Sequence, residues 1–309
     1  MTPRTENYWI LGCERLQRRC ADVGALDGAA ALRGSRPRAL AFGAANTRPR
    51  PGRGAEPAHV LLSRPMLVHT QSFRVRTFEV DAYDTLSICV LAGYLQEAAA
   101  RHATELGCGM RHLRGSGLTW VLASERLSVH KPIRLGEAIE VETWPSGVDR
   151  LALAREFRVR GQDGVVAVAT TRWLVLDLTT RRPVMPNALL EPRLFETTER
   201  VLSVSAAKFP ALVQGMERRF PVRFADIDVN DHANNTAYVA WLLEGVPERT
   251  WRTCRLASLE LQFLAECRYG SVVVSRSAEA GEREFWHVVA GVEDGRDLAR
   301  AKTAWVPRG

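Results

Sequence analysis

Polar side chains crowd the segment Asp226–Glu244, whose sequence is DIDVNDHANNTAYVAWLLE. Asp228, Asn230 and His232 alternate there, just ahead of an apolar run. If this approach is extended, the period of two of a strand points the three side chains to one side. A carboxylate, an amide and an imidazole that converge on one pocket could transfer protons and polarise a carbonyl group. Turn formation and helix capping are the alternative interpretation.

Two asparagines follow at the start of the apolar run. Asn is a favoured N-cap residue, so we expect a helix to begin near Asn234 or Asn235. The free backbone N–H groups at a helix start can stabilise a developing negative charge. The same two residues would therefore border an oxyanion site if chemistry takes place here.

A second carboxylate lies 34 residues beyond His232. In LELQFLAECRYG, apolar and polar residues alternate as in a strand, and Glu266 follows at its end beside Cys267. We expect Glu266 to point into the pocket that His232 enters, although a solvated loop carboxylate is the alternative. Cys267 is a secondary candidate, since a lone cysteine is more often a small buried apolar group than a nucleophile. The six cysteines form no CxxC pair, so no metal or other cofactor is expected.

The elements that must position these residues occur twice. The pattern predicts a strand over 73–80, a helix over 86–106 and four strands between 120 and 180. The second half predicts a strand over 216–228, a helix over 234–251 and four strands between 257 and 306. These ranges follow the same order, which indicates two copies of one unit.

The two copies can be aligned residue by residue. Ser124 matches Ser258 at the strand after the helix, and Glu97 matches Glu244 within the helix. The first half is 13 residues longer between these anchors, and we expect the Gly-rich GCGMRHLRGSG to hold the excess. In this alignment the counterparts of the polar set are Asp81, Tyr83, Thr85 and Pro132. Turn chemistry alone does not explain why one copy carries Asn and His, whereas a single asymmetric active site does.

One helix followed by antiparallel strands indicates an α+β layer. Two copies predict a tandem double hotdog: two long helices, each wrapped by a curved antiparallel sheet, joined as a pseudo-dimer. We expect an N-terminal hotdog over 66–185, a linker over 186–215 and a C-terminal hotdog over 216–309. Active sites in such dimers lie where the helix start of one unit meets the surface of the other.

Composition limits the partners. Residues 1–65 carry a net charge of +6 and residues 66–309 only +1, which is weak support for nucleic-acid binding by the folded part. Residues 1–65 are rich in Arg, Ala, Gly and Pro, so we expect them to be disordered or upstream of a natural start at Met66. No window approaches 18 consecutive apolar residues, so no membrane-spanning helix is expected. We expect a cytoplasmic, bacterial-type location, or a plastid if residues 1–65 are a transit peptide.

These segments resemble the acyl-acyl carrier protein thioesterases, which comprise the plant-type fatty acyl enzymes and their bacterial relatives. The resemblance rests on DIDVNDHANNTAYVAWLLEGVPE and LASLELQFLAECRYGSVV, and it covers about residues 70–309. Asp231 and Ala233 stand inside the first motif where the plant enzymes usually carry other residues. The resemblance implies a tandem double hotdog, and it implies catalytic roles for Asp228, Asn230, His232 and Glu266.

The resemblance further implies hydrolysis of fatty acyl-acyl carrier protein to free fatty acid and carrier. Water activated by Glu266 or Asp228 would attack the thioester, or a carboxylate would attack first and its anhydride would then be hydrolysed. Ile88, Leu91 and Leu95 of the first helix would line the acyl pocket. Core packing alone would produce the same apolar helix face.

Three rival functions stay open on the sequence. They are an acyl-CoA thioesterase, a hotdog hydratase or dehydratase, and a non-catalytic acyl-binding module. The expected partner is acyl-loaded acyl carrier protein, an acidic protein that Arg218, Arg219 and Arg223 could receive. The chain is expected to be a monomer that is itself a pseudo-dimer, or a homodimer.

Overall fold

The computed structural model of the chain describes residues 68–185, 190, 192–196, 198–202, 209–211 and 214–308. The expectations for residues 1–65 lie outside the described residues, as does much of the expected linker over 186–215. All the described residues belong to one structural unit.

The first half follows the predicted order of elements. Its strands are β1 (His69–Arg74), β2 (Leu118–Val129), β3 (Ala138–Asp149), β4 (Ala152–Gly161), β5 (Gly164–Asp177) and β6 (Pro183–Val184). Its helices are α1 (Ile88–Glu105) and α2 (Met110–Gly115), with 3-10 turns η2 (Thr77–Glu79) and η3 (Pro192–Phe195). The strand predicted over 73–80 is wrong in its second part. The carboxylate of Glu79 accepts hydrogen bonds from the backbone and side chain of Arg76, which closes η2.

The second half repeats this order with shorter helices. Its strands are β7 (Met216–Pro221), β8 (Cys254–Phe263), β9 (Val272–Gly281), β10 (Glu284–Gly291) and β11 (Asp297–Pro307). Its helices are α3 (Asn235–Leu243) and α4 (Glu248–Thr253), with the 3-10 turn η4 (Phe224–Asp226). The single helix predicted over 234–251 is therefore broken. Pro247 has no backbone N–H to continue α3, and it begins α4 instead.

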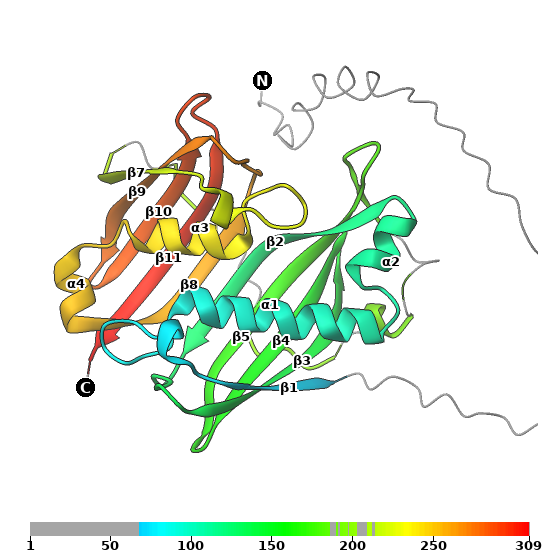
Figure 1. The fold of residues 1–309 in the computed structure, drawn as a ribbon, viewed down its shortest axis with the longest axis horizontal. Helices are drawn as coiled ribbons and strands as arrows, with labels where there is room; N and C mark the ends of the chain where they lie inside the picture. The colour runs from blue at the N-terminus through cyan, green and yellow to red at the C-terminus, as the bar shows by residue number, and fades with distance from the viewer. Residues whose placement is uncertain are drawn as a thin grey trace, which may run out of the picture. The chain divides into compact units, whose positions relative to one another are not determined.

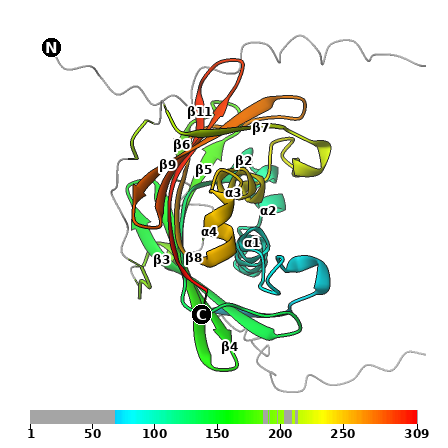
Figure 2. The same cartoon turned by 90° about the vertical axis from the view of Figure 1, so that its left-hand side faces the viewer.

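The eleven strands form one antiparallel sheet. Their order is β1-β3-β4-β5-β2-β8-β11-β10-β9-β7, with β6 paired to β5, so the halves join through β2 and β8. Figure 1 shows α1 and α3 side by side on one face of the sheet, and Figure 2 shows the sheet curving around them. One apolar core runs through both halves, from Leu95 of α1 to Leu242 of α3 and Leu261 of β8. The predicted α+β, tandem double hotdog fold is confirmed.

The central strand pair carries an internal two-fold relation. Its pairs include Ser124–Gln262, Arg126–Glu260 and Ser128–Ser258. When Ser124 is matched to Ser258, as in the sequence alignment, Gln262 is the counterpart of Ser128. A two-fold rotation about the Arg126–Glu260 pair therefore exchanges the two strands and converts the Ser124–Gln262 pair into the Ser128–Ser258 pair. The alignment of the two halves thus has a direct counterpart in the backbone.

The helices begin at equivalent positions and end at different ones. Ile88 and Asn235 each lie nine residues before the matched Glu97 and Glu244. However, α1 has 18 residues and α3 has nine. The Gly-rich segment therefore holds only part of the 13 extra residues. Most of them extend α1 past Glu97, and this extension becomes important at the site.

Candidate active site

The segment before α3 is a closed loop rather than the extended approach that we expected. The Asp228 N–H donates to the His232 carbonyl at 2.8 Å, and the Asp231 N–H donates to the Asp228 carbonyl at 3.0 Å. Asp231 takes a left-handed φ of 62°, which Asp tolerates better than most residues. The loop leads into α3 as predicted, with Asn234 as N-cap: its Oδ1 accepts from the Thr236 N–H at 2.9 Å.

This loop nevertheless brings the predicted polar residues to one pocket of about 730 Å³. From the second half, the pocket is lined by Asp228, Asn230, His232, Asn235 and Glu266. From the first half, it is lined by Arg114, Trp120 and Arg181, among others. The pocket therefore lies where the two halves meet, beside the start of α3.

Glu266 and His232 are in contact inside this pocket. The His232 Nε2 lies 3.2 Å from the Glu266 Oε2, and the Arg181 Nη2 donates to the same oxygen at 2.6 Å. About a quarter of the Glu266 side chain is exposed, so the carboxylate is reachable from the pocket. Arg181 was not predicted, because it stands in a turn after β5 with no motif around it. It reaches the site across 85 residues of sequence.

The environment of His232 favours the neutral imidazole. Burial lowers the pKa of His232 from its ordinary 6.5, while the Glu266 carboxylate opposes this by raising it. The guanidinium groups of Arg268 and Arg181 lower the pKa further, and the Arg268 Nη2 lies 3.3 Å from the His232 Nε2. At neutral pH this ring is therefore mostly uncharged, with one nitrogen able to donate and one able to accept.

Asp228 is engaged within its own loop. Its Oδ1 accepts from the Asn230 N–H at 2.7 Å, and its Oδ2 accepts from the Asn230 Nδ2 at 3.2 Å. The other end of that amide, the Asn230 Oδ1, accepts from the Arg114 Nη2 at 2.5 Å. Asp228 and Arg114 together fix the orientation of the Asn230 side-chain amide, with Nδ2 toward Asp228 and Oδ1 toward Arg114. Asp228 is thus placed to orient Asn230 rather than to contact His232.

The start of α3 borders the pocket through Asn235. The Thr236 N–H is capped by the Asn234 side chain, and the Ala237 N–H donates to the Asn234 carbonyl at 2.9 Å. The Asn235 N–H has no partner among the described residues. The Asn235 side chain donates from Nδ2 to the Gln96 Oε1 at 3.0 Å, which ties the helix start to α1. An anion in the pocket would therefore lie near the positive end of α3.

Cys267 lies beside the site without entering it. Its side chain is buried, and the Tyr238 hydroxyl donates to the Cys267 Sγ at 3.4 Å. Burial raises the pKa of the Cys267 thiol, so the nucleophilic thiolate is disfavoured. The same residue donates its backbone N–H to the Tyr238 hydroxyl at 3.1 Å. These contacts describe a packed residue that supports the wall behind Glu266.

An apolar chamber of about 790 Å³ adjoins the pocket and shares Trp120, Asp228, Asn230 and Asn235 with it. Its α1 wall consists of Gln96, Ala99, Ala100 and Ala103. The last three lie beyond Glu97, in the part of α1 that has no counterpart in α3. The predicted acyl-pocket residues lie elsewhere: Ile88 and Leu91 line a different cavity, and Leu95 lines a small recess. The face of α1 that borders this chamber is thus nearer the C-terminal end of the helix than we expected.

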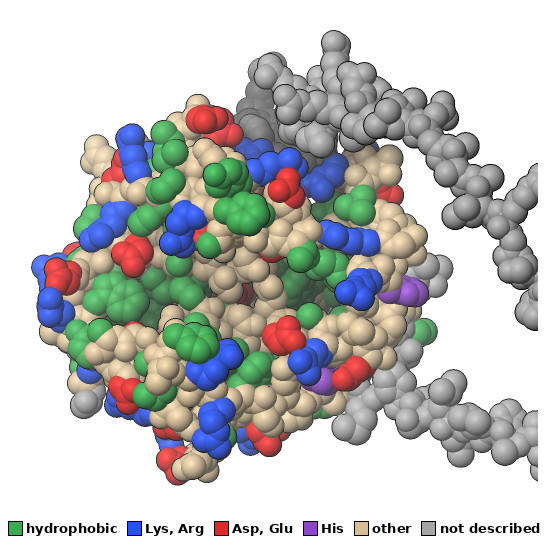
Figure 3. Space-filling view, in the orientation of Figure 1, with side chains coloured by type: hydrophobic (Ala, Val, Ile, Leu, Met, Phe, Trp, Pro, Cys, Tyr) green, Lys and Arg blue, Asp and Glu red, His purple; other side chains and the backbone are tan. Residues whose placement is uncertain are grey.

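The outer surface around the site carries mixed charge. Figure 3 shows acidic and basic side chains interspersed over the face that carries α1 and α3, with hydrophobic side chains exposed between them. The three arginines expected to receive a partner each contact an acid: Arg218 with Glu244, Arg219 with Glu217, and Arg223 with Asp226. The side chain of Arg268, next to the pocket, is about half exposed.

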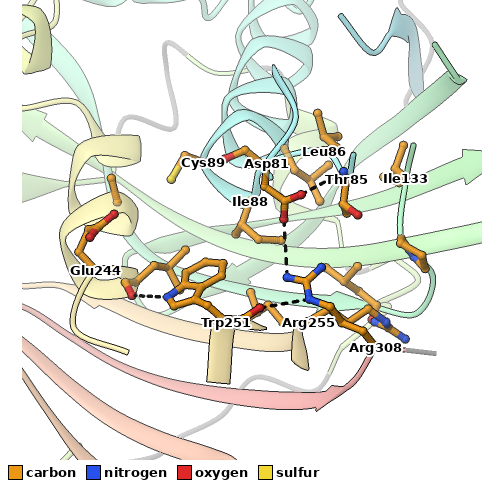
Figure 4. A pocket seen from close by; sticks show the side chains of 17 residues that line it. Asp81, Thr85, Leu86, Ile88, Cys89, Ile133, Glu244, Trp251, Arg255 and Arg308 are labelled. Atoms are coloured by element: carbon orange, nitrogen blue, oxygen red, sulfur yellow. Dashed lines mark hydrogen bonds and ion pairs between the residues drawn. The ribbon is translucent and has the colours of Figure 1, made fainter. Parts of the chain in front are cut away.

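The first half contains the same loop with different side chains. The Asp81 N–H donates to the Thr85 carbonyl at 2.8 Å, and Asp84 has a left-handed φ of 60°. A cavity of about 840 Å³ adjoins this loop and is lined by Ile88 and Leu91 (Figure 4). Asp81 faces Arg308 there, with 3.8 Å between Oδ2 and Nη2. Both copies therefore keep the loop and a neighbouring cavity, whereas only the second copy carries the amide, the imidazole and the second carboxylate.

Within the described ranges, no three His, Cys, Asp or Glu side chains are grouped so that they could hold a metal ion. In the same part of the chain, no helix is both long and apolar enough to span a bilayer.

Comparisons with known proteins indicate one family for both halves of the chain. The family profile described as acyl-ACP thioesterase N-terminal domain matches residues 66–190, and the one described as acyl-ACP thioesterase C-terminal domain matches residues 211–307. A chloroplastic acyl-[acyl-carrier-protein] hydrolase of Cuphea viscosissima is 28% identical over 270 residues, which cover 79% of this chain and 63% of the relative. The chain thus spans a little under two thirds of the length of that curated relative.

Two solved structures have a similar fold. An acyl-ACP thioesterase from Bacteroides thetaiotaomicron superposes with a TM-score of 0.71 at 26% identity, over 77% of this chain and 98% of that one. The 12:0-ACP thioesterase from Umbellularia californica also gives 0.71 at 26% identity, over 79% of this chain and 98% of that one.

We predict that the pKa of His232 responds in opposite directions to its two neighbours. In Glu266→Gln the pKa should fall further below 6.5, because the charge that raises it is lost. In Arg268→Gln it should rise, because a charge that lowers it is lost. An NMR titration of the histidine ring signals measures both, with His232→Ala to assign the resonance. A rise in Glu266→Gln would contradict the electrostatic description of the pocket.

Proposed function

Because the chain belongs to the acyl-acyl carrier protein thioesterase family, we propose that it hydrolyses fatty acyl-acyl carrier protein to free fatty acid and carrier protein. The observation that carries this proposal is the contact between Glu266 and His232, beside a helix start and next to an apolar chamber. A thioester whose carbonyl lies in the pocket could extend its acyl chain past Asn235 into the chamber. The family and the pocket chemistry thus support the same reaction.

Glu266 is our candidate for the general base. Both of its observed contacts use Oε2, so the second carboxylate oxygen is available to take a proton from water. Water would then attack the carbonyl carbon, the carbon–sulfur bond would break, and the proton would end on the sulfur of the carrier thiol. We assign His232 to the return of that proton, because it contacts the carboxylate and its lowered pKa makes the protonated ring a better proton donor.

The remaining residues would position the thioester and stabilise the oxyanion that forms on its carbonyl group. The Asn235 N–H, at the positive end of α3, would donate to the oxyanion that forms on the carbonyl. Asn230 would orient the thioester, and Asp228 would hold Asn230 in the required direction. The counterpart of Asp228 supports this smaller role: Asp81 accepts from the Tyr83 N–H in the same way, in a loop that lacks the rest of the set.

We further propose a division of labour between residues 66–185 and 216–309. The first unit would supply the acyl chamber through the extended part of α1, and the second would supply the reactive groups. The limits of the two matching family profiles support this division. The acyl-loaded carrier protein is the proposed partner, and we propose a cytoplasmic or plastid location.

We predict that removing either reactive group lowers kcat by about 100-fold or more, a typical loss for a general acid or base. Glu266→Gln keeps the shape of the side chain and removes the base, while His232→Ala removes the imidazole. Thiol release from an acyl carrier protein measures both.

The matched control is Asp231→Asn in the same loop, where the side chain is 78% exposed and Asn tolerates the left-handed φ. It should keep kcat within a few-fold, and so should Cys267→Ala. Full activity in both Glu266→Gln and His232→Ala, with folding unchanged by circular dichroism, would defeat the site assignment.

We predict that the carrier docks partly by charge. At equal acyl length, kcat/KM should be higher on acyl carrier protein than on coenzyme A. Raising the salt from low to about physiological ionic strength should raise KM for the carrier substrate, because exposed charges are screened over roughly 8–10 Å. A KM that is independent of salt would count against electrostatic docking, and a preference for coenzyme A would favour the alternative carrier.

We predict that narrowing the chamber shortens the preferred acyl chain. Ala103→Leu adds three carbons to the buried α1 wall, and forcing a long chain against them costs about 1–3 kcal/mol. The kcat/KM for the longest good substrate should therefore fall by roughly 10-fold or more, while shorter chains are affected less. The same Leu introduced at Ala98, which is buried and does not line the chamber, is the control. Equal losses at every chain length in Ala103→Leu would contradict the assignment of this chamber.

A further inference from the structure

A row of polar side chains crosses the inner face of the sheet in the first half. Glu125 of β2 pairs with Thr171 of β5, and Thr171 pairs on its other side with Arg155 of β4. Residues directly opposite each other in antiparallel strands point to the same face. The two ends of this row are ionisable groups, and both are buried. Such groups are rarely placed in a core without a partner or a function.

The second half contains the equivalent row with apolar ends. There Leu259 of β8 pairs with Thr303 of β11, and Thr303 pairs with Phe285 of β10. The central threonines correspond closely, since Trp173 donates to Thr171 at 2.8 Å and Trp305 donates to Thr303 at 3.0 Å. The fold therefore accepts Leu and Phe at these positions. The glutamate and the arginine are not required to build the sheet.

Glu125 lacks a hydrogen-bond partner at one oxygen. Its side chain is 4% exposed, and its Oε1 contacts no donor in the described part of the chain. Burial raises the pKa of the carboxyl to about 7, so both its neutral and its charged form are accessible near neutral pH. Glu125 lines a small recess, which has room for about one water-sized group. An unpaired buried oxygen on a residue that lines a recess indicates that something else supplies the hydrogen bond.

The recess adjoins the compartment proposed for the acyl chain. Gln96 and Trp173 line both the recess and the chamber, and Asn235 lines the recess, the chamber and the catalytic pocket. An acyl chain that passes the start of α3 would therefore pass the mouth of the recess. A substituent on that chain could reach Glu125. Any solvent molecule in the recess would compete with that substituent for the same space.

Arg155 gives the chamber a second polar feature. It lines the chamber wall and is buried, and its Nη1 lies 3.0 Å from the His102 Nδ1 and 3.2 Å from the Thr143 Oγ1. Both neighbours are neutral or weakly basic, and none of the described carboxylates forms an ion pair with it. Burial lowers the pKa of Arg155 to about 10. The compartment is thus less apolar than a plain alkyl chain requires.

We propose that Glu125 is a specificity residue for acyl chains that carry a hydroxyl group. A hydroxyl can donate to the carboxylate or accept from the protonated acid, so it satisfies Oε1 in either form. An unsubstituted chain would leave that oxygen unpaired, and a site with a buried unpaired polar group discriminates against such a ligand. The inference rests on the proposed function, because it names the class of acyl chain for the same site.

The test compares acyl carrier proteins loaded with chains of one length. One chain is unsubstituted, and the others each carry a single hydroxyl at a successive carbon. We expect at least one hydroxylated chain to be hydrolysed with a kcat/KM about 10-fold above that of the unsubstituted chain, as one added hydrogen bond gives. The position that gives this preference reports which carbon passes the recess.

Two variants tie the preference to Glu125. Glu125→Leu introduces the residue of the second half and should bring the ratio of the two kcat/KM values close to one. Glu125→Gln keeps a donor and an acceptor and should retain most of the preference. Ser275→Ala is the matched control, since the Ser275 Oγ is also buried and unpartnered but lies in β9 outside the compartment. It should leave the ratio unchanged.

The outcomes separate this inference from the proposed function. If the wild-type enzyme hydrolyses the unsubstituted chain as well as every hydroxylated one, the inference is overturned and the proposed function stands. The same holds if Glu125→Leu keeps the wild-type ratio, which would mean that a group other than Glu125 recognises the hydroxyl. If no carrier substrate releases thiol faster with the wild type than with His232→Ala, the proposed function itself fails. The wild-type ratio decides even if Glu125→Leu does not fold.

Discussion

The hydrogen bonds between β2 and β8 are the constraint on which the rest of the structure depends. They join the strands of both halves into one sheet. Their register is centred on the Arg126–Glu260 pair, so the two halves are related by an approximate two-fold symmetry at this strand pair. The start of each helix is thereby brought against the opposite half, next to a cavity of several hundred cubic ångströms. An antiparallel register is strongly fixed where one face is buried, since a slip by one residue would turn every core side chain outward. The symmetry therefore provides a built-in comparison: positions that differ between the halves differ for reasons other than the fold.

The largest difference is the length of the first helix. Beyond Glu97, α1 continues with small residues, whereas the chain after the matched Glu244 is interrupted by Gly245 and Pro247. The extension carries alanines over the sheet at a distance that leaves the chamber open. Larger side chains there would close it, and a helix that stopped early would leave it without a wall. Helix length and side-chain size together thus account for a chamber that adjoins the polar pocket of the second half.

Much of this could be predicted from the sequence, because the signals are local or repeated. The period of the strands, the N-cap at Asn234 and the alignment of Glu97 with Glu244 are all visible along the chain. Other features depend on contacts between distant residues. The Asp228–His232 loop is closed by a backbone hydrogen bond between distant atoms of the loop, which the alternation of residue types does not reveal. The expectation of an extended segment was therefore wrong, although the side chains do share a pocket. Arg181 lies in an ordinary turn, and its contact with Glu266 exists only after the sheet has formed. Which face of α1 borders which cavity is decided by the neighbouring half, which periodicity cannot reveal.

The two loops show how scaffold and chemistry are separated. Both are closed by the same hydrogen bonds, both contain an aspartate with a left-handed φ, and both lead into a helix. Asp81 and Asp228 bond to backbone N–H groups in each copy, so this aspartate stabilises both loops. His232 and Glu266 are not needed to form the loop, since Thr85 and Pro132 stand in their places and the first loop still forms.

The same reasoning applies to Glu125 and Arg155. A buried polar group without a full set of partners costs about 1–3 kcal/mol, which is a large share of a stability of about 5–15 kcal/mol. Where the fold itself accepts Leu or Phe, that cost is evidence that the polar side chain acts on a ligand.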